Sequence, residues 1–243
     1  MAAKRELELE REVGRGDKGL AVRRVQEWLN LRGHGLSIDG DFGRVTEDAV
    51  MRFQRAHRLR STGSVGARTF ASLVSPMASA LLRQKRKPPH LAAAVLACAG
   101  AHLAQHPREV GGPNRGPWVR LYMNGVEGQP WCAGFVSFVL TQGAAAARVP
   151  TPIAGSVSCD ELAAQARAKN ILVAEGNRDG LRAGAIFLVR RTPTDWTHTG
   201  FVAEPRPDLF TTIEGNTNDD GEREGYEVCR LSRGYKNKDF ILI

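Results

Sequence analysis

A seven-residue pattern occurs twice near the start of the chain and strongly restricts its local fold. Residues 40–46 (GDFGRVT) and 63–69 (GSVGART) both place glycine first and fourth, an apolar residue third and threonine seventh, with a spacing of 23 residues. Glycine permits a tight turn, and threonine is a common residue at the N-cap of a helix. The repeat therefore predicts two glycine-rich turns, each followed by a helix capped by Thr46 or Thr69.

Three helices are expected around these turns. Asp17 is placed to cap a first helix that ends near Gly33, and apolar residues in 22–32 follow helical spacing. A second helix is expected from Thr46 to about residue 57, and a third over 67–74. Together they predict a small helical module over residues 14–75. The charged residues 1–13 are expected to form a mobile arm or a fraying helix.

Several motifs of this module resemble the peptidoglycan-binding domain of cell-wall hydrolases. The matching pieces are Val25-Gln26-x-x-Leu29, Asp39-Gly40-x-Phe42-Gly43-x-x-Thr46 and Gly63-x-Val65-Gly66-x-x-Thr69, and the resemblance covers residues 14–74. It implies a domain that docks on peptidoglycan and performs no catalysis. Asp39, Asp41 and Gln54 are the polar candidates for contacting the ligand, and roles in turns and caps are equally open for them.

The positive charge of the chain is concentrated in its first half. The formal net charge is +8. Lys and Arg outnumber Asp and Glu by 14 to 10 in residues 1–75 and by 5 to 1 in 76–110, whereas both number 15 in 111–243. Such a distribution suits an anionic partner, whether nucleic acid, anionic lipid or cell wall. The resemblance favours the cell wall as the partner, and nucleic acid is not expected to bind.

Five basic or polar residues before Pro88 and Pro89 predict a linker over 76–90.

The second half changes from helical to strand periodicity along the chain. Helices are expected over 90–105, from 131 onward, and over 159–169, where Ser158 and Glu161 form a capping box. Five short strands follow, at 184–189, 199–203, 210–214, 226–231 and 240–243. Helices followed by an antiparallel sheet predict an α+β fold over residues 91–243.

Cys132 is the strongest candidate for a nucleophile. It follows a Gly-x-Pro turn at the expected start of a helix, where the helix dipole and free N–H groups stabilise a thiolate. The alternative is an inert buried cysteine, which is the interpretation given to Cys98 and Cys229. Cys159 also stands at a helix start, but its neighbours show no other sign of a site. No C-x-x-C pair occurs, so structural zinc is not expected.

A cysteine nucleophile needs a base and a group that orients the base. His198 is the only histidine in the strand region, and Glu214 and Asn216 end the next expected strand. If these strands form a hairpin, the start of the first lies beside the end of the second. His198 would then adjoin Glu214 and Asn216, one holding the imidazole and the other stabilising an oxyanion or orienting the peptide.

Residues 92–243 resemble the cysteine, histidine-dependent amidohydrolase/peptidase (CHAP) family, which has a papain-like fold. The matching pieces are Pro130-Trp131-Cys132-Ala133-x-Phe135-Val136, His198-x-Gly200-x-Val202, Glu214-Gly215-Asn216 and Asn114-Arg115-Gly116-Pro117. The resemblance implies Cys132 as nucleophile, His198 as base, Glu214 as its orienting group and Asn216 as a fourth polar residue. Expected substrate contacts are Asn114, Trp131 and Trp196. No metal or cofactor is expected, since residues 123–131 offer Glu127 as their only acid.

These features together predict a two-domain peptidoglycan hydrolase that cleaves an amide bond of the wall peptide. It is either an N-acetylmuramoyl-L-alanine amidase or an endopeptidase, and a monomer is expected. The charged N-terminus lacks the pattern of a signal peptide, and no apolar run approaches a membrane span. A phage-type endolysin made in the cytoplasm and released to the wall is therefore expected, with an injected effector as the alternative. A non-catalytic wall-binding protein and an intracellular amide hydrolase are the other hypotheses.

Overall fold

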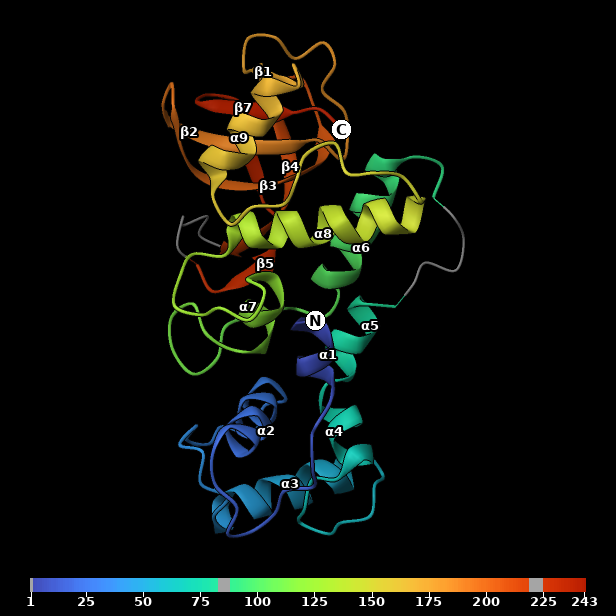
Figure 1. Cartoon of the computed structure of the whole chain (residues 1–243), viewed down its shortest axis with the longest axis vertical. Helices are drawn as coiled ribbons and strands as arrows, with labels where there is room; N and C mark the ends of the chain where they lie inside the picture. The colour runs from blue at the N-terminus through green and yellow to red at the C-terminus, as the bar shows by residue number, and fades with distance from the viewer. Residues whose placement is uncertain (1, 83–87, 219–224) are drawn as a thin grey trace. The chain divides into compact units, whose positions relative to one another are not determined.

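The computed structural model describes residues 2–82, 88–218 and 225–243, and the side chains from residue 5 onward (Figure 1). The chain forms two compact units. Unit 1 comprises Met1–Ser79 and Arg108–Gly128, and unit 2 comprises Ala80–Pro107 and Gln129–Ile243. Residues 108–128, which the resemblance assigns to the catalytic half, thus pack within unit 1. The basic run at 83–87, expected as part of a linker, lies outside the described residues.

Unit 1 is helical around an apolar core. Its helices are α1 (Ala2–Leu7), α2 (Leu20–Leu31), α3 (Arg44–Ala56), α4 (Ala67–Leu73) and α7 (Pro117–Tyr122), and α5 (Ser75–Ala80) reaches its boundary. The aromatic side chains buried in this core are Trp28, Phe42, Phe53, Phe70, Trp118 and Tyr122. Helices α2, α3 and α4 are the three expected from the sequence.

The helix starts of unit 1 differ from the prediction. Helices α2, α3 and α4 have glycines at their N-caps (Gly19, Gly43 and Gly66), and none of the three receives a side-chain cap. Asp17 instead accepts a hydrogen bond from the backbone N–H of Gly14. The two threonines lie inside their helices and are buried. Their capping role was predicted wrongly because their hydroxyl groups serve a buried glutamine.

Two buried glutamines explain the repeated motif. Gln26 Nε2 donates to Thr46 Oγ1 (3.3 Å) and to Asp39 Oδ1 (2.7 Å), and Gln26 Oε1 accepts from Gly40 N–H (2.8 Å). Gln54 makes the equivalent contacts with the second copy of the motif, and its Nε2 donates to Thr69 Oγ1 at 3.1 Å. Each glutamine thereby fixes one glycine-rich turn to the helix that follows it.

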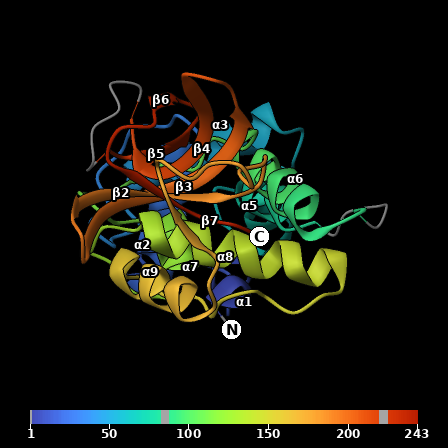
Figure 2. The same cartoon turned by 90° about the horizontal axis from the view of Figure 1, so that it is seen from above.

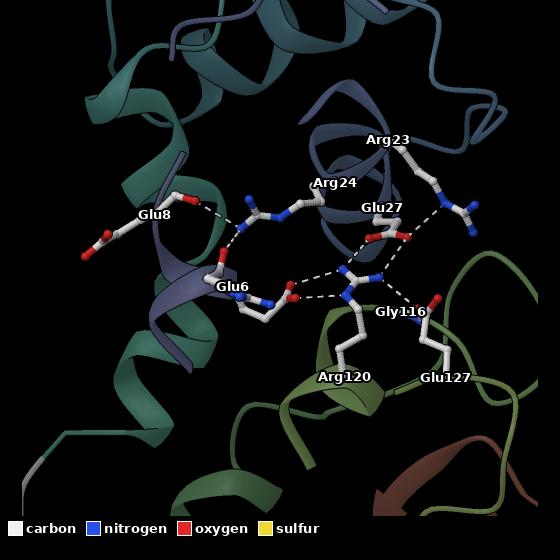
Figure 3. Close-up of polar contacts among 9 residues, drawn as sticks. Glu6, Glu8, Arg23, Arg24, Glu27, Gly116, Arg120 and Glu127 are labelled. Carbon is white, nitrogen blue, oxygen red and sulfur yellow. Dashed lines mark hydrogen bonds and ion pairs between the residues drawn. The ribbon is translucent and has the colours of Figure 1, made fainter. Parts of the chain in front are cut away.

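Residues 108–128 are joined to the rest of unit 1 by Arg120 (Figure 3). Its guanidinium donates to Glu6 Oε1 at 2.8 Å, to Glu27 Oε2 at 2.7 Å and to Glu127 Oε1 at 2.8 Å. Glu6 and Glu27 are buried. Residues 1–13, expected as a mobile arm or a fraying helix, therefore include a helix, α1, that contributes a buried ion pair.

Unit 2 packs helices on an antiparallel sheet. Its helices are α6 (Leu91–Leu103), α8 (Cys132–Ala147) and α9 (Cys159–Ala168). The strands are β1 (Leu172–Ala174), β2 (Ile186–Thr192), β3 (Asp195–Pro205), β4 (Leu209–Thr217), β5 (Glu227–Cys229), β6 (Ser232–Gly234) and β7 (Lys238–Ile241). Their order is β1-β7-β2-β3-β4-β5, with β6 also paired to β4. The α+β architecture is as predicted.

The sheet of unit 2 has apolar side chains on both faces. Helices α8 and α9 lie on the same side of the sheet (Figure 2), and Phe135 of α8 packs edge-to-face on Phe201 of β3. A second apolar cluster includes Phe187, Phe210 and Phe240. Among the described residues, no helix combines the length and the apolar character that a membrane span requires.

Candidate active site

Cys132 is the first residue of α8, as the sequence predicts. Trp131 occupies the N-cap, and the thiol is almost fully buried. The backbone N–H of Ala133 lies close enough to the sulfur to stabilise a thiolate. A helix of 16 residues also places the positive end of its dipole at this sulfur. The local structure therefore favours the charged, nucleophilic form of the cysteine.

His198 and Glu214 meet across the β3–β4 hairpin. Gly200 pairs with Glu214 in this antiparallel ladder, so His198 lies two residues from that pair. The Nε2 atom of His198 is 2.7 Å from Glu214 Oε2, and both side chains are buried. The other ring nitrogen, Nδ1, makes no hydrogen bond to a described residue within ordinary distance limits, and Cys132 acts on the ring together with Glu214 to raise its pKa. The hairpin thus brings His198 and Glu214 together, and Cys132 acts on the same ring from the start of α8.

Arg233 completes the site and was not found by sequence reasoning. Its Nε donates to Glu214 Oε1 at 2.6 Å and its Nη2 donates to Oε2 at 2.6 Å. The Thr212 hydroxyl donates to the same carboxylate at 2.5 Å. Arg233 lies on β6, a three-residue strand without an apolar pattern, and one arginine among many in the sequence gives no signal. The two-point contact fixes the plane of the carboxylate that orients His198.

The pKa values of these groups indicate an ion pair. Burial alone would lower the pKa of His198, but the contacts with Cys132 and Glu214 outweigh it and raise this pKa to about 9. The contact with Cys159 lowers the pKa of Cys132 well below its usual value, burial opposes this, and His198 adds to the lowering. Burial raises the pKa of Glu214, whereas His198 and Arg233 together bring it down to about 2. The charged forms are therefore thiolate, imidazolium and carboxylate.

Cys159 lies unexpectedly close to Cys132. The two sulfur atoms are 4.0 Å apart, and Cys159 is the first residue of α9, just as Cys132 is of α8. Ser158 caps this helix and accepts a hydrogen bond from Glu161 N–H, which is half of the predicted capping box; the other half differs, because Ser158 N–H donates to Ser156 Oγ and Ser156 Oγ in turn donates to the Glu161 carboxylate. The sequence places both cysteines at helix starts but does not reveal that the two helix starts meet.

Two glycines of the site motifs are explained by close packing. A Cβ atom on Gly200 would lie 2.8 Å from both Glu214 Cγ and Phe187 Cε1. A Cβ atom on Gly215 would lie 2.7 Å from the Trp131 ring. Glycine at these two positions therefore leaves room for Glu214 and Phe187 beside Gly200 and for Trp131 beside Gly215.

The structure does not bring all the expected site residues to one place. Trp131 is completely buried and lies against Gly215, within the core of unit 2. Trp196 is 5% exposed, and its Nε1 donates to Asp239 Oδ2 at 2.8 Å. Asn114 belongs to unit 1, where its backbone N–H donates to Glu109. Their expected contacts with substrate stay predictions.

Asn216 is buried in β4 with a φ of 58°. This left-handed conformation is one that asparagine tolerates better than most residues. It also interrupts the regular alternation of the strand, so the spacing of two residues does not by itself place Asn216 on the same face as Glu214. Its role as the fourth polar residue stays a prediction.

The polar candidates of unit 1 hold turns together. Asp39 accepts hydrogen bonds from Gln26 and from Asp41 N–H, and Gln54 is 1% exposed. A hollow of about 450 Å³ on this unit is lined in part by Thr62, Ser64 and Thr69, which accept hydrogen bonds from Gln54. It is lined by ten residues: Glu12, Arg58, Leu59, Arg60, Thr62, Ser64, Gly66, Ala67, Arg68 and Thr69. None of its three arginine side chains pairs with an acidic side chain of the described residues.

No cluster of metal-binding side chains occurs in the described part of the chain, judged by groups of three or more His, Cys, Asp or Glu.

The comparison with protein families identifies the first module. Residues 18–73 match the family described as "peptidoglycan binding domain". The chain therefore contains an N-terminal helical domain of this family, which has peptidoglycan as its partner and the cell wall as its place of action. The match ends before unit 2 begins, so the role of unit 2 depends on its own geometry.

Three solved structures are similar to part of the chain. The N-terminal domain of SleB is 34% identical over 26% of this chain and 89% of that chain, with a TM-score of 0.26. A fused Zn-dependent amidase/peptidase/peptidoglycan-binding domain-containing protein from Clostridium acetobutylicum is 35% identical over 26% of this chain and 28% of that chain (TM-score 0.25). The Burkholderia AP3 phage endolysin is 29% identical over 38% of this chain and 36% of that chain (TM-score 0.26). The search of curated proteins gives no match.

Proposed function

We propose that unit 2 is a CHAP-type cysteine hydrolase that cleaves an amide bond in the peptide part of peptidoglycan. The observation that carries this proposal is the buried series Cys132, His198 and Glu214, with 2.7 Å between His198 Nε2 and Glu214 Oε2. A thiolate at a helix start beside an imidazolium is the arrangement that acyl transfer requires. The peptidoglycan-binding domain on the same chain supports the wall as the source of the substrate.

The proposed reaction proceeds through a thioester. The Cys132 thiolate attacks the amide carbonyl carbon, and backbone N–H groups at the start of α8 stabilise the oxyanion. His198 gives its proton to the leaving amine as the C–N bond breaks. The neutral imidazole then takes a proton from water as the water oxygen attacks the thioester carbon, the C–S bond breaks, and the carboxylic acid leaves with the thiolate and imidazolium restored. No step requires a metal ion.

Digestion of purified peptidoglycan tests this proposal. Wild type, Cys132→Ala and the control Cys98→Ala are compared, and mass spectrometry identifies the released fragments. If wild type and the control release fragments and Cys132→Ala does not, the result supports the cysteine mechanism. Free lactyl ends with intact peptides identify an amidase, and cut peptides identify an endopeptidase. Equal release by Cys132→Ala, or no release by any of the three proteins, would contradict the proposal and favour a non-catalytic wall-binding protein.

The arginine-lined hollow is the proposed contact with the wall. Arg58, Arg60 and Arg68 are exposed and offer guanidinium groups that suit the carboxylates of the stem peptide. Glu12 stands at the same hollow and suits an amine. Tethering by this surface would raise the local concentration of substrate without adding contacts at Cys132.

A sedimentation assay tests this contact. The double variant Arg58→Ala, Arg68→Ala is compared with the double variant Arg44→Ala, Arg52→Ala, which removes two other arginines from the same unit. We expect the first to bind purified wall at least tenfold more weakly and the second to bind like wild type. Equal binding by both variants, or unchanged wild-type binding to glycan strands stripped of their peptides, would overturn this assignment.

A further inference from the structure

The close pair of thiols at the site has a chemical consequence of its own. Cys132 and Cys159 are 5% and 8% exposed, and their sulfur atoms are 4.0 Å apart. A disulfide requires about 2.05 Å between the sulfurs, so the pair must close by roughly 2 Å. Both residues begin a helix, and no helical turn of the same element precedes their side chains. Changes of side-chain rotamer can therefore supply much of this movement.

A peroxide-sensing pair needs one reactive thiolate and one neighbouring thiol, and the two cysteines differ in this respect. The contact with Cys159, the imidazolium of His198 and the N–H of Ala133 all favour the thiolate of Cys132, which makes it the more reactive sulfur. Cys159 lies on a different helix and is the neighbouring thiol within reach. Cys98 lies within α6 and Cys229 within β5, both buried, and neither begins a helix.

We propose that Cys132 and Cys159 form a reversible disulfide when the protein meets a peroxide, which blocks the nucleophile and protects it from irreversible oxidation. That the disulfide switches off hydrolysis rests on the proposed function, whereas its formation rests on the thiol geometry alone.

The chemistry of the proposed switch balances in two steps. The Cys132 thiolate attacks one oxygen of hydrogen peroxide, the O–O bond breaks, and a sulfenic acid and hydroxide form. The Cys159 sulfur then attacks the sulfenic sulfur, displaces its hydroxyl group and forms the S–S bond. With protons returned to both hydroxides, two thiols and one hydrogen peroxide give one disulfide and two waters. A dithiol reverses the step by thiol–disulfide exchange and is itself oxidised.

Peptide mapping of the full chain tests the switch directly. Wild type is treated with hydrogen peroxide, the remaining thiols are alkylated with iodoacetamide, and the digest is analysed by mass spectrometry without reduction. We expect a linked peptide pair that contains Cys132 and Cys159, and an intact mass lower by two hydrogens. Dithiothreitol should remove the link and restore both thiols. The variants Cys98→Ser and Cys229→Ser serve as controls and should form the same link.

The variant Cys159→Ser distinguishes a switch from simple oxidation. Without its partner thiol, Cys132 should proceed to the sulfinic acid, seen as a gain of two oxygens that dithiothreitol does not reverse. If Cys132 of the wild type is oxidised but is not linked to Cys159, the inference is overturned. This result is obtained with wild-type protein and does not depend on the folding of a variant. A reversible link in a protein that releases no wall fragments would instead contradict the hydrolase proposal while leaving the thiol switch intact.

Discussion

His102 and His198 are both buried, yet their pKa values move in opposite directions. Burial lowers the pKa of His102 to about 4, because its partner at 2.9 Å is the neutral side chain of Gln142. His198 has a carboxylate and a thiol as partners, and its pKa rises to about 9. Burial sets the cost of the charge, and the partners decide whether the charge forms. Of these two histidines, only His198 can therefore act as a general acid at neutral pH.

This difference predicts a pH profile for wall digestion. Activity should rise as Cys132 and Glu214 lose their protons, remain high while thiolate, imidazolium and carboxylate coexist, and fall as pH increases through about 9, where His198 deprotonates. The rate of peptidoglycan clearing between pH 4 and pH 10 measures it. Cys98→Ala should give the same profile, and a flat profile together with full resistance to iodoacetamide would contradict the mechanism.

Arg233 gives a second prediction for a single residue, because it holds Glu214 without touching the reacting atoms. Arg233→Ala should lower kcat by roughly tenfold, since two charge-assisted hydrogen bonds are lost. It should also raise the pKa of Glu214, because Arg233 lowers that pKa in the wild type. The acid limb of the pH profile should therefore move to higher pH.

Two further variants separate the charge of Arg233 from its geometry. Arg233→Lys keeps the charge and should leave the acid limb in place while still reducing kcat, because lysine cannot make the two-point contact. Arg230→Ala removes an exposed neighbouring arginine and should change neither quantity. An unshifted acid limb in Arg233→Ala would show that Arg233 has no electrostatic role at the carboxylate.

At the scale of elements, a close crossing of α6 and α8 supports the position of Cys132. Gly143 of α8 faces Val95 of α6, and a Cβ atom there would lie 2.7 Å from Val95 Cγ2 and 2.9 Å from its Cα. The second of these atoms is backbone, which cannot rotate away. Helix α8 carries Cys132 at its other end, so a shift of this crossing would displace the nucleophile.

Matched substitutions test the crossing. Gly143→Ala should lower the free energy of unfolding by about 1–3 kcal/mol through overpacking. Gly100→Ala, on α6 with no atom within 4 Å of the added Cβ, should raise it by up to about 1 kcal/mol because alanine favours a helix. Thermal denaturation followed by circular dichroism measures both. Equal effects of the same sign would show that helix propensity, and not packing, governs these positions.

The elements of the site were predicted unevenly, for physical reasons. Helix α8 and strands β3 and β4 each contain a run of buried residues, and the apolar runs of these segments are visible in the sequence. Strands β1 and β6 are three residues long, too short for a pattern, and they exist because a neighbouring strand offers free hydrogen-bonding groups. Arg233 escaped prediction because it lies on one of them.

At the scale of the whole molecule, unit 1 is assembled from two separate stretches of chain. Residues 108–128 belong to unit 1, although the preceding segment 80–107 belongs to unit 2. Trp118 packs edge-to-face on Trp28 at 6.2 Å between ring centroids, and Arg120 pairs with Glu6 and Glu27. The peptidoglycan-binding domain therefore depends on residues beyond the 18–73 range that its family model matches.

Removal of the Arg120 charge tests this dependence. Arg120→Met should destabilise unit 1 by about 3 kcal/mol, because Glu6 would remain buried without Arg120 and Glu27 would keep only Arg23, at 3.4 Å. Adding Glu27→Gln to the same chain should recover part of the loss by removing one of the uncompensated charges. Differential scanning calorimetry of the full chain measures these changes, with Arg115→Ala as the exposed control. A stability equal to wild type in Arg120→Met would show that the ion pairs make no net contribution.

The sequence by itself determined the local features: the repeated turns, the α+β order, the helix start at Cys132 and the hairpin that carries His198 and Glu214. These follow from propensity, periodicity and short spacing along the chain. Only the tertiary structure decided which distant groups meet, namely Cys159 beside Cys132, Arg233 on Glu214 and Arg120 between Glu6 and Glu27. Such pairs are set by how packed elements cross in three dimensions, and a single sequence contains no periodic signal for that crossing.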